Sequence, residues 1–110
     1  MPAPDLDVAK IRKYCDARVP AELRDRARID VNVRGNIVTI FDCRPPWHES
    51  LTEWSKVAVA QFRYKTDDRN WALYWADRNG RWHTYDDLDP GPIDVLLAAV
   101  DADPTGIFWG

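Results

Sequence analysis

The sequence predicts an α+β fold in which about five antiparallel strands form a meander sheet, and a helix at each end of the chain packs on one sheet face. Two observations carry this prediction. Segments of alternating apolar and polar residues follow one another through the middle of the chain, separated by short turn sequences. Segments with the helical spacing of apolar residues lie before and after them. With 110 residues, the chain has room for one domain, residues 1–110.

The first element is predicted to be a helix that Asp5 or Asp7 caps and that runs to about Arg18. Ile11 and Cys15 recur at the spacing that places side chains on one helical face. Pro20, which cannot continue the backbone hydrogen bonds, either ends this helix or starts another turn, and a short helical turn from Ala21 to Arg26 is possible.

Arg28 to Val33 alternates in the manner of a half-buried strand. Gly35-Asn36 then supplies a two-residue turn of type II′, and Ile37 to Cys43 returns as the antiparallel partner. Pro45-Pro46 stops this strand, so Arg44 to Lys56 is predicted to be an irregular loop.

Val57 to Lys65 resumes the alternation, with one face predicted to carry Ala58, Ala60, Phe62 and Tyr64. The next hairpin turns at Asp77-Arg78-Asn79-Gly80, where Asn-Gly suits a type I′ turn. That turn sets Trp75 opposite Thr84 and Asp77 opposite Trp82. The packed face of the hairpin would then carry Trp71, Leu73, Trp75 and Trp82, and the other face Tyr74, Arg81, His83 and Tyr85.

The last predicted element is a helix from Ile93 to Val100, which has strong helix formers and a proline at a permitted position in its first turn. After it, Ile107, Phe108 and Trp109 would expose a large apolar area if left free. We therefore expect this tail to dock, either on its own sheet or on a neighbouring subunit.

Composition narrows the class of protein. An apolar fraction of 45% and a net charge of −3 suit a soluble domain, and no run of residues is long enough to span a membrane. The acidic amino terminus does not resemble a secretory signal, so the expected location is cytoplasmic, without membrane association. Cys15 and Cys43 are expected to be buried and reduced. No metal site, cofactor or catalytic group is predicted.

The predicted loop holds the best candidate ligand residues. Trp47 and Trp54 can wall an aromatic pocket, and Arg44 can hold a carboxylate or phosphate. His48 can transfer protons with Glu49 or Glu53. His83 and Tyr85 are candidate neighbours of this site. The sequence thus predicts a small binding or interaction module for an unknown small ligand or protein partner. An ordinary packed loop explains the same residues.

Three alternatives stay open. The aromatic sheet face can stack the bases of a single-stranded nucleic acid, although the overall acidity argues against phosphate binding. A small hydrolase or nuclease-like enzyme would use His48 or His83 with a loop carboxylate. A homodimer would form through an exposed sheet edge or through Trp109.

The chain also resembles a bacterial family of uncharacterised proteins, catalogued as domain of unknown function 3024. The resemblance covers nearly the whole chain and rests on VRGNIVTIFDCRPPW, AVAQFRYK, WALYWADRNGRWHTYDDL and DADPTGIFWG. It implies no activity, because the family has none assigned. The matching positions are Arg34, Gly35, Arg44, Pro45, Pro46, Trp47, Trp75, Asp77, Gly80, Trp82, Tyr85, Gly106 and Trp109.

Overall fold

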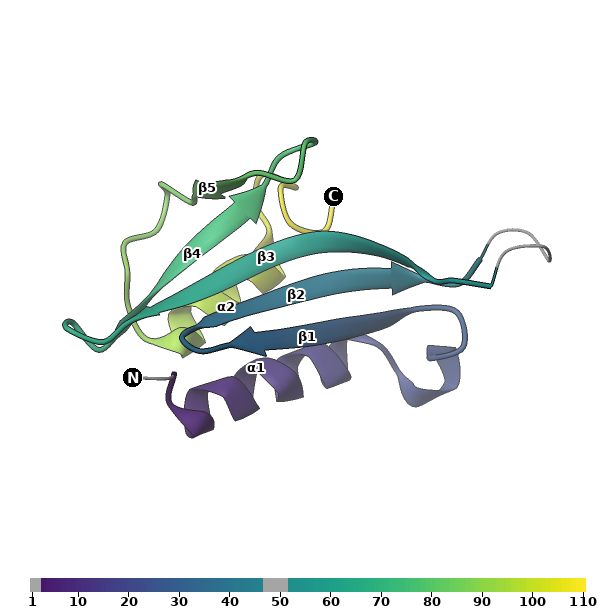
Figure 1. Cartoon of the computed structure of the whole chain (residues 1–110), viewed down its shortest axis with the longest axis horizontal. Coiled ribbons are helices and arrows are strands. Elements are labelled where there is room, and N and C mark those ends of the chain that lie inside the picture. Colours follow the sequence, from purple (N-terminus) through teal and green to yellow (C-terminus); the bar gives the residue numbers. More distant parts are fainter. Residues whose placement is uncertain (1–2, 47–51) are drawn as a thin grey trace.

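The computed structural model of the protein describes residues 3–46 and 52–110, and two helices lie on one side of a five-stranded sheet (Figure 1). The strands follow one another across the sheet in chain order, each antiparallel to the last. The predicted α+β meander is therefore confirmed. In chain order the elements are α1 (Asp5–Arg18), η1 (Ala21–Leu23), β1 (Arg28–Arg34), β2 (Ile37–Arg44), β3 (Ser55–Lys65), β4 (Asn70–Ala76), β5 (Trp82–Thr84) and α2 (Ile93–Ala102).

The core lies between the helices and one face of the sheet. Ile11 of α1 and Leu96 of α2 are fully buried against Ile40 and Phe62 of the sheet. Trp71 is 1% exposed, and its indole N–H donates to the Asp7 carboxylate at 2.8 Å. Neither long helix of the described residues lies on the other sheet face, which we call the open face. No helix among the described residues is long and apolar enough to cross a membrane.

The predicted cap of α1 is wrong. Pro4 occupies the cap position, no side chain bonds the free N–H groups of the first turn, and Asp5 and Asp7 both lie inside that turn. The carboxylate of Asp7 is turned to Trp71 instead. A buried indole N–H without a partner would cost more than an exposed helix end that water can solvate.

The β1–β2 turn agrees with the prediction, because Arg34 pairs with Ile37 around a two-residue loop in which Gly35 has a φ of 60°. The β2–β3 loop is shorter than predicted. Arg44 pairs with Ser55, so both ends of the expected 44–56 loop belong to strands. Extended backbone continues to the first proline, which has no N–H to donate to the sheet.

A register shift between Ile40 and Phe41 corrects the predicted face of β3. Ile40 pairs with Ala60 and Phe41 with Ala58, so Val59 is an extra residue. Val59 and Ala60 are both buried in the core, while Ala58 lies on the open face. The alternation expected for Ala58 and Ala60 therefore breaks at this bulge.

The β4–β5 hairpin has a three-residue loop rather than the predicted type I′ turn. Among its residues only Gly80 has a positive φ, of 79°, and Asp77 N–H donates to the Arg81 carbonyl. Trp75 consequently pairs with His83 and Ala76 with Trp82. This is one residue away from the predicted register, and a shift of one residue moves every side chain of β5 to the other face.

The carboxyl-terminal tail docks on the protein's own core. This is one of the two predicted arrangements, the other being docking on a neighbouring subunit. Phe108 is 7% exposed and packs on Tyr85 with ring centroids 5.2 Å apart. Asp103 ends α2 with a φ of 41°, and its carboxylate accepts the N–H of Phe108 at 3.0 Å and of Trp109 at 2.8 Å. Burial alone would raise the pKa of Asp103, but these backbone hydrogen bonds outweigh it and lower the pKa.

Candidate functional site

The predicted loop site can be followed only in part, because Trp47 and His48 lie outside the described residues. Glu53 is exposed and Trp54 is partly buried. Arg44 makes a two-pronged ion pair with Asp42, in which Nε and Nη2 lie 3.2 and 3.3 Å from the two carboxylate oxygens. Arg44 therefore extends along its own strand.

Arg44 and Trp54 do not share a site. The Trp54 ring lies 4.0 Å beneath the guanidinium of Arg28. Arg28 pairs with Cys43, the neighbour of Arg44 in β2, and successive residues of a strand point to opposite faces. Among the described residues, the two side chains that were expected to form one pocket lie on opposite faces of the sheet.

His83 is a partner of Asp77. Its Nε2 lies 2.7 Å from Asp77 Oδ2, and its ring stacks on Trp75 with centroids 4.6 Å apart. The other oxygen of Asp77 accepts the N–H groups of Asn79 and Arg81. These hydrogen bonds lower the pKa of Asp77, and the bond to His83 has the largest effect. The pair fixes the hairpin turn.

Tyr85 is a core residue. It is 6% exposed and packs against Phe108. The predicted grouping of His83 and Tyr85 on the open face with Tyr74 is wrong, because the shifted register turns both toward the helix side. The same shift places Trp82 on the open face, where the prediction had it packed.

The open face of the sheet carries a group of basic side chains that the sequence did not reveal. Its strand residues include the basic side chains Arg28, Arg34, Lys56 and Arg63, whereas Asp30 is the acidic one and pairs with Lys56 at 3.6 Å. Because the whole chain has a net charge of −3, the excess of acidic groups lies elsewhere. No linear segment combines these residues, so only the strand register brings them together.

A polar chain crosses the middle of the open face and fixes one of its arginines. Gln61 Nε2 donates to Thr39 Oγ1 at 3.0 Å, and Arg63 Nε donates to Gln61 Oε1 at 2.7 Å. Thr39 is 9% and Gln61 is 8% exposed. The Arg63 guanidinium also lies 3.8 Å from the centre of the Tyr74 ring. Arg63 is thus held flat on the face, with its terminal N–H groups outside these bonds.

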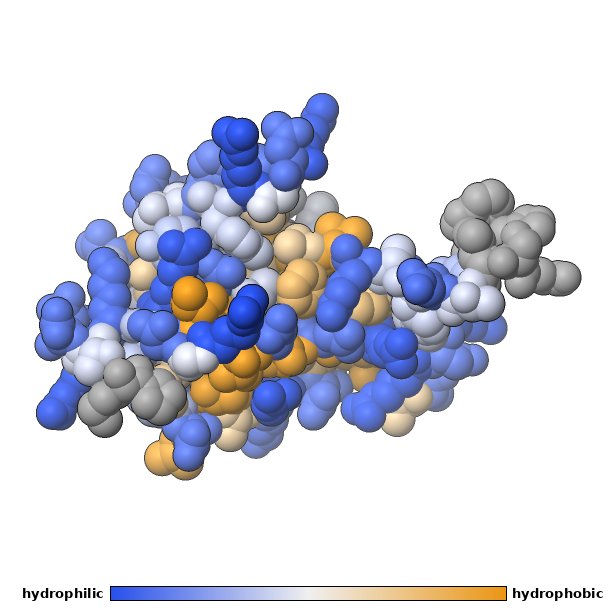
Figure 2. Space-filling view, viewed as in Figure 1, coloured by the Kyte–Doolittle hydropathy of each residue, from blue (hydrophilic) through white to orange (hydrophobic). Residues whose placement is uncertain are grey.

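A groove of about 460 Å³ runs over this face from β1 to β5. Its walls combine aromatic side chains with amides and a guanidinium. Figure 2 shows the molecule from this direction, with apolar atoms in the middle of the view and hydrophilic side chains around them. The groove is lined by Asn32, Arg34, Ile37, Thr39, Phe41, Ala58, Gln61, Gly80 and Trp82.

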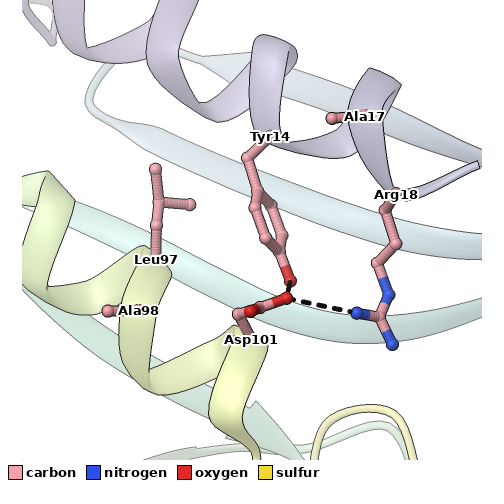
Figure 3. Close-up of a pocket in the computed structure, with 6 residues that line it drawn as sticks. All are labelled: Tyr14, Ala17, Arg18, Leu97, Ala98 and Asp101. Carbon is pink, nitrogen blue, oxygen red and sulfur yellow. Dashed lines mark hydrogen bonds and ion pairs between the residues drawn. The ribbon is translucent and has the colours of Figure 1, made fainter.

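A second cleft, of about 430 Å³, lies between the helices. In Figure 3, Tyr14 and Arg18 of α1 point toward Asp101 of α2, and their hydrogen bonds to Oδ1 measure 3.2 and 3.4 Å. Burial raises the pKa of Tyr14. The charge of Arg18 lowers this pKa in part, whereas the charge of Asp101 raises it further. These polar groups satisfy one another, so they join the two helices.

The cysteines provide no nucleophile. Both are free and buried, as expected. Burial raises the pKa of Cys15 to about 12 and also raises the pKa of Cys43, so each thiol stays protonated at neutral pH. Within residues 3–46 and 52–110, no cluster of His, Cys, Asp and Glu has the arrangement of a metal site.

Comparison with known proteins gives a family but no activity. No curated protein and no solved structure matches the chain. The sequence model of one family, described as Domain of unknown function (DUF3024), matches residues 1–110. The chain, whose sheet leaves one basic and aromatic face open, belongs to this family.

Proposed function

We propose that this protein is a binding module whose open face takes single-stranded nucleic acid. The observation that carries the proposal is the charge of that face, which is positive on a protein of net charge −3. A groove lined by Phe41 and Trp82 crosses the same face. Unpaired bases stack on aromatic rings, and phosphates bind arginine and lysine.

The arrangement favours a single strand over a duplex. Arg34 and Arg63 flank Ile37 at one end of the face, while Arg28 and Lys56 flank Cys43 at the other. The aromatic groove begins at Arg34 and Ile37 of the first group and extends to Phe41 and Ala58, next to the second group along the strands. A chain with splayed bases can place phosphates on both groups and bases between them, whereas a duplex keeps its bases inside.

The preorganised side chain of Arg63 also supports the proposal. A free arginine side chain loses rotamer entropy when it binds a phosphate, at a cost of up to about 2 kcal/mol. Gln61 and Tyr74 already hold the guanidinium of Arg63 in one orientation. Less entropy is therefore lost on binding. A cytoplasmic setting is proposed with this function, supported by the two free thiols, and a bacterial source is proposed from the family resemblance.

The test is fluorescence anisotropy with a labelled twelve-nucleotide oligothymidine over a series of salt concentrations. The double variant Arg34→Met/Arg63→Met should weaken binding at least tenfold at low salt. It should also reduce the slope of log K against log salt by about 1.4, since each single-strand phosphate contact contributes about 0.7.

The matched control is Lys10→Met/Lys13→Met, which removes the same charge from exposed positions of α1, where Lys10 pairs with Asp94 of α2 on the helix side. It should bind almost as the unchanged protein does. Equal losses in the two double variants would show that net charge, and not the open face, governs binding. No anisotropy change at 100 micromolar protein and low salt would overturn the proposal.

A further inference from the structure

A third cleft lies on the helix side of the sheet, away from the open face, and we call it the arginine cleft. It has a volume of about 460 Å³. Its walls come from the end of α1, from η1, from β1 and β2, and from the carboxyl-terminal tail. The residues used below are Arg18, Leu23, Ile29, Asp42, Arg44 and Trp109.

Two guanidinium groups meet at this cleft from elements far apart in the sequence. Arg18 lies 3.8 Å from the centre of the Trp109 ring and donates to Asp101 at 3.4 Å. Arg44 is held by the two oxygens of Asp42. Each guanidinium has five N–H donors, so each retains donors beyond these bonds. Both are positioned before any ligand arrives.

The remaining lining is apolar. Leu23 is 43% exposed and lines the cleft with Ile29 and the Trp109 ring. A ligand body that covers Leu23 would remove this apolar area from water. The charged groups of the lining are Arg18, Arg44 and Asp42, and Arg18 also pairs with Asp101 beside the cleft, so each guanidinium presents only its remaining N–H donors. The cleft therefore complements a molecule with an apolar body and one planar pair of acceptor oxygens, such as a carboxylate.

We propose that the arginine cleft binds a small organic monoanion, a carboxylate on an aromatic or aliphatic body. The carboxylate accepts hydrogen bonds from Arg44 and Arg18, and the body lies on Leu23, Ile29 and the Trp109 ring. Planar guanidinium groups suit carboxylates because two parallel N–H groups match two oxygens. This site is separate from the open face, so the nucleic-acid proposal and this one stand or fall independently.

The experiment uses 4-(trifluoromethyl)benzoate as the probe, and ¹⁹F NMR line broadening measures its binding to the full chain. Its neutral amide has the same body without the charge, and should bind at least tenfold more weakly. Arg44→Met should weaken binding of the carboxylate about tenfold and leave binding of the amide unchanged. Arg24→Met, an exposed residue outside the cleft, is the matched control and should bind as the unchanged protein does.

A second variant makes the test independent of any effect on folding. Leu23→Glu places a carboxylate at the cleft, and the exposure of Leu23 predicts that the fold survives. It should abolish binding of the probe while near-ultraviolet circular dichroism stays unchanged. Equal binding of benzoate and amide, unchanged binding by both cleft variants, or no saturable binding up to 10 millimolar probe would each overturn the proposal.

Discussion

At the scale of single residues, three aspartates have structural roles that their sequence positions do not announce. Asp7 accepts the indole N–H of Trp71, Asp77 accepts two backbone N–H groups of its turn, and Asp103 accepts two of the tail. Asp7 was a predicted cap of its own helix, and no role was predicted for Asp77 or Asp103. Asp7 and Asp103 satisfy partly buried donors, for which a missing partner is costly, whereas Asp77 orders an exposed turn.

Asp103→Asn should destabilise the protein by about 1.5–3 kcal/mol, the range for hydrogen bonds to a charged group. Asparagine tolerates the positive φ of this position but offers one oxygen where the carboxylate offers two. Urea unfolding measures the change, with Asp89→Asn at an exposed site as the control. Equal stability of the two variants would mean that the tail is held by its apolar contacts alone.

At the scale of elements, one buried hydrogen bond joins the first helix to the middle of the sheet. Asp7 in α1 and Trp71 in β4 are 64 positions apart, and Trp71 is almost fully buried. The hydrophobic pattern predicted that these elements pack on a common core. It did not predict this bond, because the expected role of Asp7 was to cap its own helix.

Asp7→Ala should cost about 1–3 kcal/mol by leaving a buried N–H unpaired. Asp5→Ala is the matched control, since it removes a carboxylate from the same first turn and so accounts for the helix-dipole contribution of about 0.3–1 kcal/mol. The loss on Trp71→Phe should be smaller in the Asp7→Ala background than in the unchanged protein. Strict additivity in this double-mutant cycle, measured by urea unfolding, would contradict the bond.

At the scale of the whole molecule, charge is divided between the two sides of the sheet. Four basic side chains from β1 and β3 meet on the open face, whereas Asp94 and Asp101 lie on α2 on the other side. Along the sequence the charges are divided differently, because residues 10–34 are rich in lysine and arginine whereas residues 86–110 have six aspartates and no basic residue. Strand pairing redistributes those charges, and the partner that a surface attracts depends on the folded distribution.

Stability should fall as pH drops below about 4, the pKa of an unfolded aspartate being about 3.9. The folded pKa values of Asp77 and Asp103 are lowered, so the folded state favours their ionised forms. That contribution is present above the unfolded value and is lost as the pH falls through the lower folded values. Urea midpoints at pH 7, 5, 4 and 3 measure it. Asp77→Asn/Asp103→Asn should show a shallower fall, and an unchanged slope would contradict this assignment.

The sequence by itself determined the strands, both long helices, the two-residue turn at Gly35 and the burial of the apolar tail, though not where the tail docks, because side-chain periodicity and apolar area act locally. Only the tertiary structure decided which residues share a face. Asn79-Gly80 permits two turn lengths, and the difference of one residue moved Trp82 to the open face and His83 and Tyr85 away from it. The bulge at Val59 likewise depends on contacts across strands. The residues that make up a surface of several strands depend on the strand register. The local sequence pattern is compatible with more than one register, and tertiary packing determines which of them forms.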